Sequence, residues 1–276
     1  MVINMDHTIL ENKINLLVDF FKGKNVVIAY SGGVDSSVLV QIAFQSAKKV
    51  IAYTMASPIL LPGEVEYAKK LAEEMGWDHH IEEIDHLTED IFVSNPENRC
   101  YYCKKGLARR LLNFAKKTGA DIIAEGTNAT ETTGHRPGLK ALKENNIESP
   151  FLNFDVSKDE IREMARKFNL SNSENPSLAC LATRFPYGSK ITLEKLKRVG
   201  KAELFITNNF RVKTVRVRDH EGLARIELDP VERKVFYDDE KMDLVDETLK
   251  KFGFTYVSLD CKGYRTGSIN EANKAN

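Results

Sequence analysis

Apolar and polar positions along this chain repeat with two different periods. Leu10, Ile14 and Phe21 recur at helical spacing, so they predict a helix over residues 7–22, for which Asp6 is a suitable N-cap. The predicted strands that follow cover residues 25–30, 49–54, 79–84 and 121–125, and the predicted helices cover residues 36–47, 63–75, 101–117, 138–145 and 158–168. Strands regularly separated by helices indicate an α/β fold with a doubly wound parallel sheet, covered by helices on both faces.

The pattern changes after the segment NPSLACLATRFPYGSK at residues 175–190. The elements predicted beyond it are helices at 192–208 and 239–252, strands at 212–218, 223–228 and 254–260, and a hairpin turn at 220–222. We therefore predict two domains, a larger α/β domain over residues 1–186 and a smaller α+β domain over residues 187–276 for substrate binding or oligomerisation. The tail after Gly267 is expected to fray.

The strongest local signal is SGGVDS at residues 31–36, which follows a predicted buried strand and opens a helix. Gly32 and Gly33 let the backbone approach a phosphate, and the amides at the helix start attract the anion. Asp35 is placed to orient the loop or to help hold Mg²⁺. The hydroxyl donors are Ser31, Ser36 and Ser37. The alternative is an ordinary glycine turn capped by serine and aspartate, since the loop lacks the lysine of a Walker A sequence.

A second polar segment, EGTNATETTGHRPG at residues 125–138, follows another predicted strand. Gly126, Thr127 and Asn128 stand at the carboxyl end of that strand, where open α/β sheets bind ligands. We predict that they join the phosphate-binding site of the loop at residues 31–36. The alternative is a polar surface turn.

Three of the four cysteines form a candidate metal site. Cys100 and Cys103 stand at a predicted helix start, where the helix dipole favours thiolates, and Cys180 lies at the junction of the predicted domains. Three thiolates suffice to hold a 4Fe-4S cluster with one iron open, whereas four would suit a structural zinc site. Cys261 adjoins a predicted strand, and we expect it to be a small buried core residue.

Composition narrows the function classes. The chain has 276 residues with 40 basic and 40 acidic side chains, so no overall basic field recruits nucleic acid or anionic lipid. The sequence has no pattern of a secretion signal or membrane span, and four cysteines in a chain of this length do not make a disulfide framework. We expect a soluble cytoplasmic protein that takes a small-molecule substrate.

The loop at 31–36 resembles the pyrophosphate-binding loop of the PP-loop ATP pyrophosphatases, whose fold is of the adenine nucleotide α-hydrolase-like type. The order SGGVDS, NRCYYCKK, EGTN with HRPGLKAL, LACLATRFPYG and VRVR resembles the LarE family over nearly the whole chain. This resemblance implies an ATP- and Mg²⁺-dependent sulfurtransferase of nickel-pincer nucleotide biosynthesis. Such an enzyme adenylates the carboxylates of pyridinium-3,5-biscarboxylic acid mononucleotide, releases pyrophosphate and forms thiocarboxylates.

The family resemblance also assigns roles to the cysteines. One kind of LarE sacrifices a cysteine at the position of Cys180, and another holds a 4Fe-4S cluster on cysteines at the positions of Cys100, Cys103 and Cys180. This chain has all three cysteines and resembles the second kind. The resemblance therefore implies repeated turnover with sulfur from an external sulfide donor, with Cys180 also at the catalytic centre.

Six charged residues match family positions in the active site. The resemblance implies that the carboxylates of Glu203 and Asp239 belong to the catalytic residues. It implies that four arginines bind the anionic substrate, and these are Arg184, Arg216, Arg218 and Arg265. On residue type alone, each of the six would be a solvated surface charge, and the VRVR arginines would mark the wet face of a strand. LarE relatives form hexamers, so the resemblance also implies a homo-oligomer.

Three alternatives stay open at this stage. A PP-loop tRNA thiolase would need an RNA-binding surface, which neutral overall charge does not favour. An ammonia-using adenylating ligase would leave the cysteines without a function in catalysis. A regulatory module, stabilised by zinc or simply binding ATP, would not split the nucleotide.

Overall fold

The computed structural model describes residues 7–132, 137–176, 179–265 and 268. The chain divides into two compact units, and neither is a single stretch of sequence. The first unit consists of Met1–Ala56, Gly63–Ile84 and Cys100–Ser177, and the second consists of Ser57–Pro62, Asp85–Arg99 and Leu178–Asn276. Two segments from the first half of the chain thus join the second unit, because backbone hydrogen bonds tie them to it. The Leu181 amide donates to the Ile59 carbonyl, and the Ile191 amide donates to the Val93 carbonyl.

Four parallel strands form the sheet of the first unit. They are β1 (Asn25–Ala29), β2 (Lys49–Ala56), β3 (Asp78–Glu83) and β4 (Ile122–Ala124), in the order β3-β2-β1-β4. Val27 of β1 lies between Ile51 of β2 and Ile123 of β4. Because the chain runs outward from β1 in both directions, the β1–β4 border is the topological switch point of the sheet.

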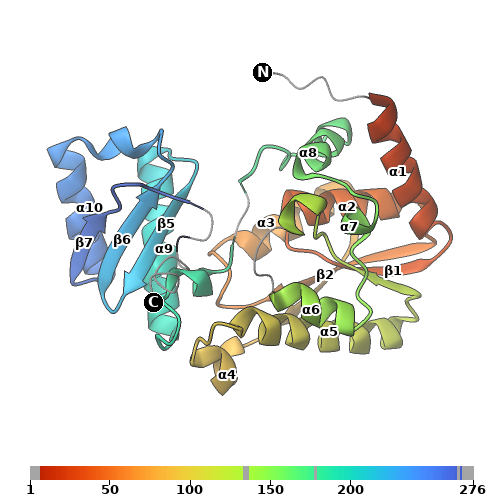
Figure 1. The fold of residues 1–276 in the computed structure, drawn as a ribbon, viewed down its shortest axis with the longest axis horizontal. Helices are drawn as coiled ribbons and strands as arrows, with labels where there is room; N and C mark the ends of the chain where they lie inside the picture. Colours follow the sequence, from red (N-terminus) through yellow and green to blue (C-terminus); the bar gives the residue numbers. More distant parts are fainter. Residues whose placement is uncertain (1–6, 133–136, 177–178, 266–267, 269–276) are drawn as a thin grey trace. The chain divides into compact units, whose positions relative to one another are not determined.

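Helices cover both faces of this sheet (Figure 1). One face carries α1 (His7–Phe21), α2 (Val34–Ser46), α3 (Glu64–Met75) and α8 (Lys158–Lys167), and the other carries α5 (Arg99–Thr118) and α6 (Pro137–Glu144). The predicted α/β fold with a parallel, doubly covered sheet is confirmed. The predicted cap Asp6 lies outside the described residues, as does the tail after Gly267 apart from Ser268.

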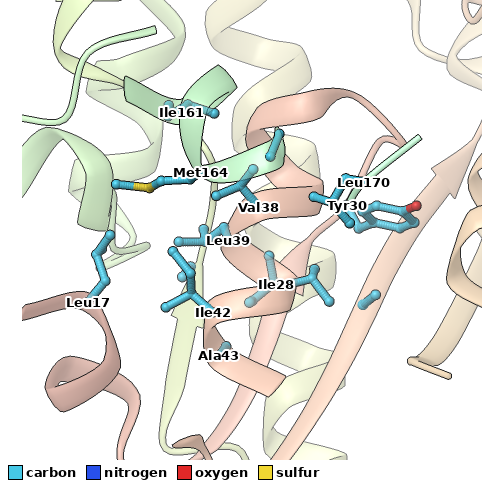
Figure 2. Packing of buried hydrophobic residues seen from close by; sticks show 14 of the residues in the cluster. Leu17, Ile28, Tyr30, Val38, Leu39, Ile42, Ala43, Ile161, Met164 and Leu170 are labelled. Carbon is cyan, nitrogen blue, oxygen red and sulfur yellow. The ribbon is translucent and has the colours of Figure 1, made fainter. Parts of the chain in front are cut away.

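Helix α2 is buried on nearly every side, which fixes the loop at its start. Val38, Leu39 and Ile42 of α2 are fully buried. They belong to one apolar cluster with Ile28 of β1 and Met164 of α8, shown in Figure 2. Full burial of such a side chain stabilises the fold by about 1.5–3 kcal/mol. The N-terminal turn of α2 is therefore held between the sheet and α8.

The second unit contains a mixed three-stranded sheet. Its elements are β5 (Val215–His220), β6 (Leu223–Leu228), β7 (Tyr256–Leu259), α9 (Leu193–Phe210) and α10 (Asp239–Lys251). β6 pairs antiparallel with β5 and parallel with β7. The predicted hairpin turn is present, and Glu221 and Gly222 at its centre have φ of 52° and 98°. Positive φ at both central residues is the geometry of a tight two-residue hairpin.

Several short elements carry no periodic signal in the sequence. They are α4 (Asp90–Val93), α7 (Pro150–Asn153), η1 (His86–Thr88), η2 (Ala129–Thr132), η3 (Leu181–Arg184) and η4 (Arg233–Phe236). A single turn is too short for an apolar face to repeat, so pattern alone does not detect it. In the described part of the chain, no helix combines the length and the apolar character needed to cross a membrane.

Candidate functional site

The loop between β1 and α2 is shaped by glycine backbone and serine hydroxyls. Gly32 has φ of +76°, and a Cβ at this position would lie 2.9 Å from the Cβ of Ala68, so only glycine fits. Ser36 Oγ donates to the Gly33 carbonyl at 3.0 Å and accepts from the Ser31 amide at 3.2 Å. Because Gly33 is the N-cap of α2, no capping side chain accepts from the amides of its first turn. These amides can bind an anion.

The side chain of Asn172 anchors this loop through hydrogen bonds. Its Nδ2 donates to the Gly32 carbonyl at 2.9 Å and to Ser37 Oγ at 2.8 Å, and the side chain is fully buried. Ser37 Oγ in turn donates to the Gly33 carbonyl at 2.9 Å. Asn172 was not among the predicted site residues, because it follows α8 and lies far from the loop along the chain.

The segment after β4 lies beside the same loop. A Cβ on Gly126 would lie 3.1 Å from the Ser36 amide nitrogen, so the two backbones are in close contact. Asn128 is fully buried, and its Nδ2 donates to Asp35 Oδ1 at 3.1 Å. Thr127 Oγ1 donates to Glu125 Oε2 at 2.7 Å. Two predicted segments thus meet at the carboxyl ends of β1 and β4, at the switch point; residues 133–136 of the second segment lie outside the described residues.

A lysine that was not among the predicted site residues joins the cluster formed by Asp35 and Asn128. Lys158, the first residue of α8, forms an ion pair with Asp35 through Nζ and Oδ2. Its backbone amide donates to Thr130 Oγ1 at 3.0 Å. The carboxylate of the loop is therefore partnered by one cation and one amide.

The cysteines fall into different parts of the molecule. Cys100 and Cys103 lie three residues apart on α5 of the first unit, on the same side of the helix, and both are half-buried. Cys180, also half-buried, precedes η3 in the second unit. No disulfide joins the four described cysteines, and among the described residues of either unit no three His, Cys, Asp or Glu side chains are grouped to hold a metal ion.

The expectation that Cys261 is a core residue is wrong. Its side chain is exposed, because it follows β7, the edge strand of the second sheet. It lines a hollow of about 250 Å³ whose other lining residues are Ile226, Leu228, Arg233, Tyr237, Leu259 and Asp260.

Two of the predicted site residues form a buried ion pair in the second unit. Arg184 Nε and Nη2 donate to the two carboxylate oxygens of Glu203 at 2.7 and 2.8 Å. Arg184 is 0% exposed, and its Nη1 donates to the Ala179 carbonyl at 3.0 Å and to Thr183 Oγ1 at 2.7 Å. Glu203 also accepts from the Val217 amide at 2.9 Å. The pair therefore braces the segment that carries Cys180.

The two arginines of the VRVR strand are buried as well. Arg218 donates to Glu227 through Nε at 3.1 Å and Nη2 at 2.8 Å, and its Nη1 donates to the Thr183 carbonyl at 2.8 Å. Arg216 lies over the ring of Tyr264, with 5.2 Å between the guanidinium carbon and the ring centroid. The alternative that these arginines mark a wet face of the strand is therefore wrong.

The remaining two predicted residues are less enclosed. Arg265 Nη1 donates to Asp260 Oδ1 at 3.1 Å and to the Gly263 carbonyl at 2.8 Å. Asp239 is exposed in the first turn of α10, where a carboxylate interacts favourably with the helix dipole. The structure therefore gives Asp239 the position of a surface charge, with no enclosed partner among the described residues.

The charges of the arginine cluster in the second unit, some buried and some half-buried, do not cancel. Burial alone would lower the pKa of Arg184, but the ion pair with Glu203 outweighs it and raises that pKa. Burial lowers the pKa of Arg216, and the nearby charge of Arg184 lowers it further. The described members of the cluster are the cations Arg184, Arg216, Arg218, Arg225 and Arg265 and the anions Glu203, Glu227 and Asp260. This excess of guanidinium groups suits an anionic ligand.

The fold and the loop between β1 and α2 together indicate a broad class of protein. The model of the asparagine synthase family matches residues 22–91, which run from β1 and the loop through α2, β2 and α3 to β3 and the start of α4. A parallel sheet with this loop at its switch point is the architecture of the ATP-using PP-loop proteins.

Comparison with individual proteins is more specific. The uncharacterized protein slr1717 of Synechocystis is 38% identical over 95% of this chain and 98% of its own length. Pyridinium-3,5-bisthiocarboxylic acid mononucleotide synthase of Lactiplantibacillus plantarum is 31% identical over 96% of this chain and 95% of its own length. The tRNA-specific 2-thiouridylase MnmA of Ruegeria is 26% identical over 64% and 56%. The chain belongs to the LarE family, as its motif order predicts.

Proposed function

We propose that this protein is an ATP-dependent sulfurtransferase of nickel-pincer nucleotide biosynthesis. It adenylates the carboxylates of pyridinium-3,5-biscarboxylic acid mononucleotide and converts them to thiocarboxylates. The observation that carries the proposal is the glycine-shaped loop at the sheet's switch point, in a chain 31% identical to a synthase of the corresponding bisthiocarboxylic acid over 96% of its length.

The first step is adenylation of a substrate carboxylate. A carboxylate oxygen attacks the α-phosphorus of ATP, and pyrophosphate leaves. The amides of the first turn of α2 and the hydroxyl of Ser31, which is exposed, would bind the departing pyrophosphate. Asp35 offers the oxygen ligands that Mg²⁺ prefers, and Mg²⁺ would supply charge neutralisation on the phosphates.

The second step is sulfur transfer. A sulfur nucleophile attacks the acyl carbon of the adenylate, and AMP leaves. We propose that Cys100, Cys103 and Cys180 hold a 4Fe-4S cluster, because thiolates are its usual ligands. Such a cluster, when bound, supplies an iron with an open position for sulfur from an external sulfide donor. The pair one turn apart on α5 suits two of the three ligands.

The arginine cluster would bind the anionic substrate. Arg184 and Arg218 are each paired with a carboxylate that is at most 3% exposed, so we assign them to shaping the site. We assign contact with substrate oxygens to Arg216 and to Arg265, whose ion pair with Asp260 is less enclosed. Glu203 would act through Arg184, since both its oxygens accept from that guanidinium. Asp239, which is exposed, keeps only the role that the family resemblance gives it.

We further propose that the protein works in the cytoplasm as a homo-oligomer, by family analogy a hexamer. Size-exclusion chromatography with light scattering is expected to show an oligomer, and a monomer at micromolar concentration would contradict this.

The decisive experiment combines turnover with metal analysis. Anaerobically purified protein is supplied with ATP, Mg²⁺, sulfide and the biscarboxylic nucleotide, and pyrophosphate and thiocarboxylate are measured. About four irons per chain are expected, lost in Cys100→Ala, Cys103→Ala and Cys180→Ala but kept in the control Cys261→Ala. Pyrophosphate release without thiocarboxylate would refute sulfur transfer. At most one sulfur transferred per chain, without iron and lost in Cys180→Ala, would instead make Cys180 a sacrificial sulfur donor.

A tRNA thiolase is the second candidate, favoured by the 26% identity to MnmA proteins. It predicts tRNA binding that weakens steeply with salt, because each neutralised phosphate releases counterions. Absence of tRNA binding at low salt would remove this candidate.

A further inference from the structure

The phosphate loop contains one charged side chain, and its charge has the wrong sign for binding phosphate. Residues 31–37 read SGGVDSS, so Asp35 is the only ionised group among them. A carboxylate repels the phosphates of a nucleotide unless a cation compensates it. The loop has no lysine of its own to do so.

Lys158 provides a cation at this position from a distant part of the chain. It is the first residue of α8, and its ammonium group is paired with Asp35. Its side chain is 18% exposed, so it is enclosed but accessible to a ligand. The ammonium group of this partly enclosed ion pair lies beside Asp35 in the first turn of α2, where the helix amides also attract an anion.

The backbone around Lys158 is fixed. Ser157 and Glu160 form a reciprocal capping box, with the Ser157 amide donating to Glu160 Oε2 at 2.7 Å. The Lys158 amide donates to Thr130 Oγ1 at 3.0 Å, which ties α8 to the segment after β4. Because α8 also packs on α2 through Met164, the lysine is held at a set distance from the loop.

A neighbouring side chain indicates that the cluster is built for a ligand. Asn128 is fully buried beside Asp35, and its amide nitrogen donates to that carboxylate. Its Oδ1 is buried without a hydrogen-bond partner. Leaving a buried acceptor unsatisfied costs about 1–3 kcal/mol, so a donor arriving with bound nucleotide would offset this cost.

We infer that Lys158 is the phosphate-binding cation of this site. Without nucleotide its ammonium group neutralises Asp35, and with ATP bound it contacts an oxygen of the pyrophosphate end. It thus performs from α8 the task that a Walker A lysine performs from within its loop. The inference rests on the proposed function, because it takes the loop to be the site of the leaving pyrophosphate.

Pyrophosphate binding measured by calorimetry in EDTA tests this inference without Mg²⁺. Lys158→Gln is expected to weaken pyrophosphate binding about 10- to 100-fold, the range for losing a charge-assisted hydrogen bond. The matched control is Lys13→Gln, which breaks an ion pair of similar burial between α1 and Glu160 of α8 and leaves the Lys158–Asp35 pair and the Ser157–Glu160 capping box in place. The control is expected to bind pyrophosphate like the wild type.

The double variant Asp35→Asn/Lys158→Gln separates direct contact from neutralisation. If Lys158 touches phosphate, the double variant binds pyrophosphate more weakly than Asp35→Asn alone. Wild-type affinity in Lys158→Gln, or equal affinity in Asp35→Asn and the double variant, would overturn the inference. Failure of the wild type itself to bind pyrophosphate or ATP would instead overturn the proposed function of the loop.

Discussion

The buried pair of Arg184 and Glu203 gives the sharpest prediction on stability. In Glu203→Gln the side-chain volume is kept, but the negative charge opposite a fully buried guanidinium is removed. Removing one partner of a buried ion pair costs about 3–5 kcal/mol, because the other charge is left in a medium of low polarity. At roughly 2–4 °C per kcal/mol, the unfolding midpoint is expected to fall by about 6–20 °C.

The assays are urea unfolding, for the free energy of unfolding, and thermal unfolding, for the midpoint temperature, of wild type and variant, both followed by circular dichroism. The matched control is Glu221→Gln, which removes a carboxylate paired with Lys195 but 67% exposed, and a loss of at most about 1 kcal/mol is expected there. Amide hydrogen exchange at Val217, which donates to Glu203, should also accelerate in Glu203→Gln. If Glu203→Gln unfolds within 1 kcal/mol of the wild type while activity is lost, Glu203 is a catalytic group and not a structural partner of Arg184.

Three further predictions concern the first unit. Gly32→Ala should destabilise by more than the roughly 1–2 kcal/mol of backbone strain, because its Cβ would also meet Ala68. Gly23→Ala, with φ of +73° and no atom within 4 Å, should show the strain alone in the same unfolding assay. Asn172→Ala should raise KM for ATP about tenfold by releasing the loop, and an unchanged KM would contradict this. Burial raises the pKa of Glu160, but hydrogen bonds from Lys13 of α1 and from Ser157 of the capping box outweigh it and lower this pKa below 4.5. The ionised carboxylate therefore stabilises the fold above that pH, and this stabilisation is lost on acidification. The stability gap between wild type and Glu160→Gln should therefore shrink from pH 6 to pH 3, and a constant gap would refute the reasoning.

The main elements of the fold could be predicted because their apolar patterns are long. The four parallel strands and the helices between them stand close to their predicted bounds. Element ends were less predictable: α2 begins at Val34, two residues before the predicted start, because Gly33 already serves as its N-cap. Short turns such as α4 could not be found, since four residues cannot show a repeating face.

The candidate site was predictable where its residues share one segment. The glycines and serines of 31–37 carry their own signal, and the segment after β4 follows from the rule for strand ends. Asn172 and Lys158 carry no such signal, because their meeting with the loop depends on how α8 packs against α2. Residue type alone gave a wrong prediction for Arg216, because arginine is ordinarily solvated but this side chain is only 6% exposed.

The interleaving of the two units limits how this protein can be divided. The chain passes from one unit to the other after residues 56, 62, 84, 99 and 177. A fragment cut at residue 186 would retain Ile59 and Phe92, which are buried in the second unit, but would lack most of that unit. Their apolar surface would then face water, which favours aggregation. The second unit is therefore not an exchangeable module: recombination that replaces it must also replace two short segments inside the first half of the gene.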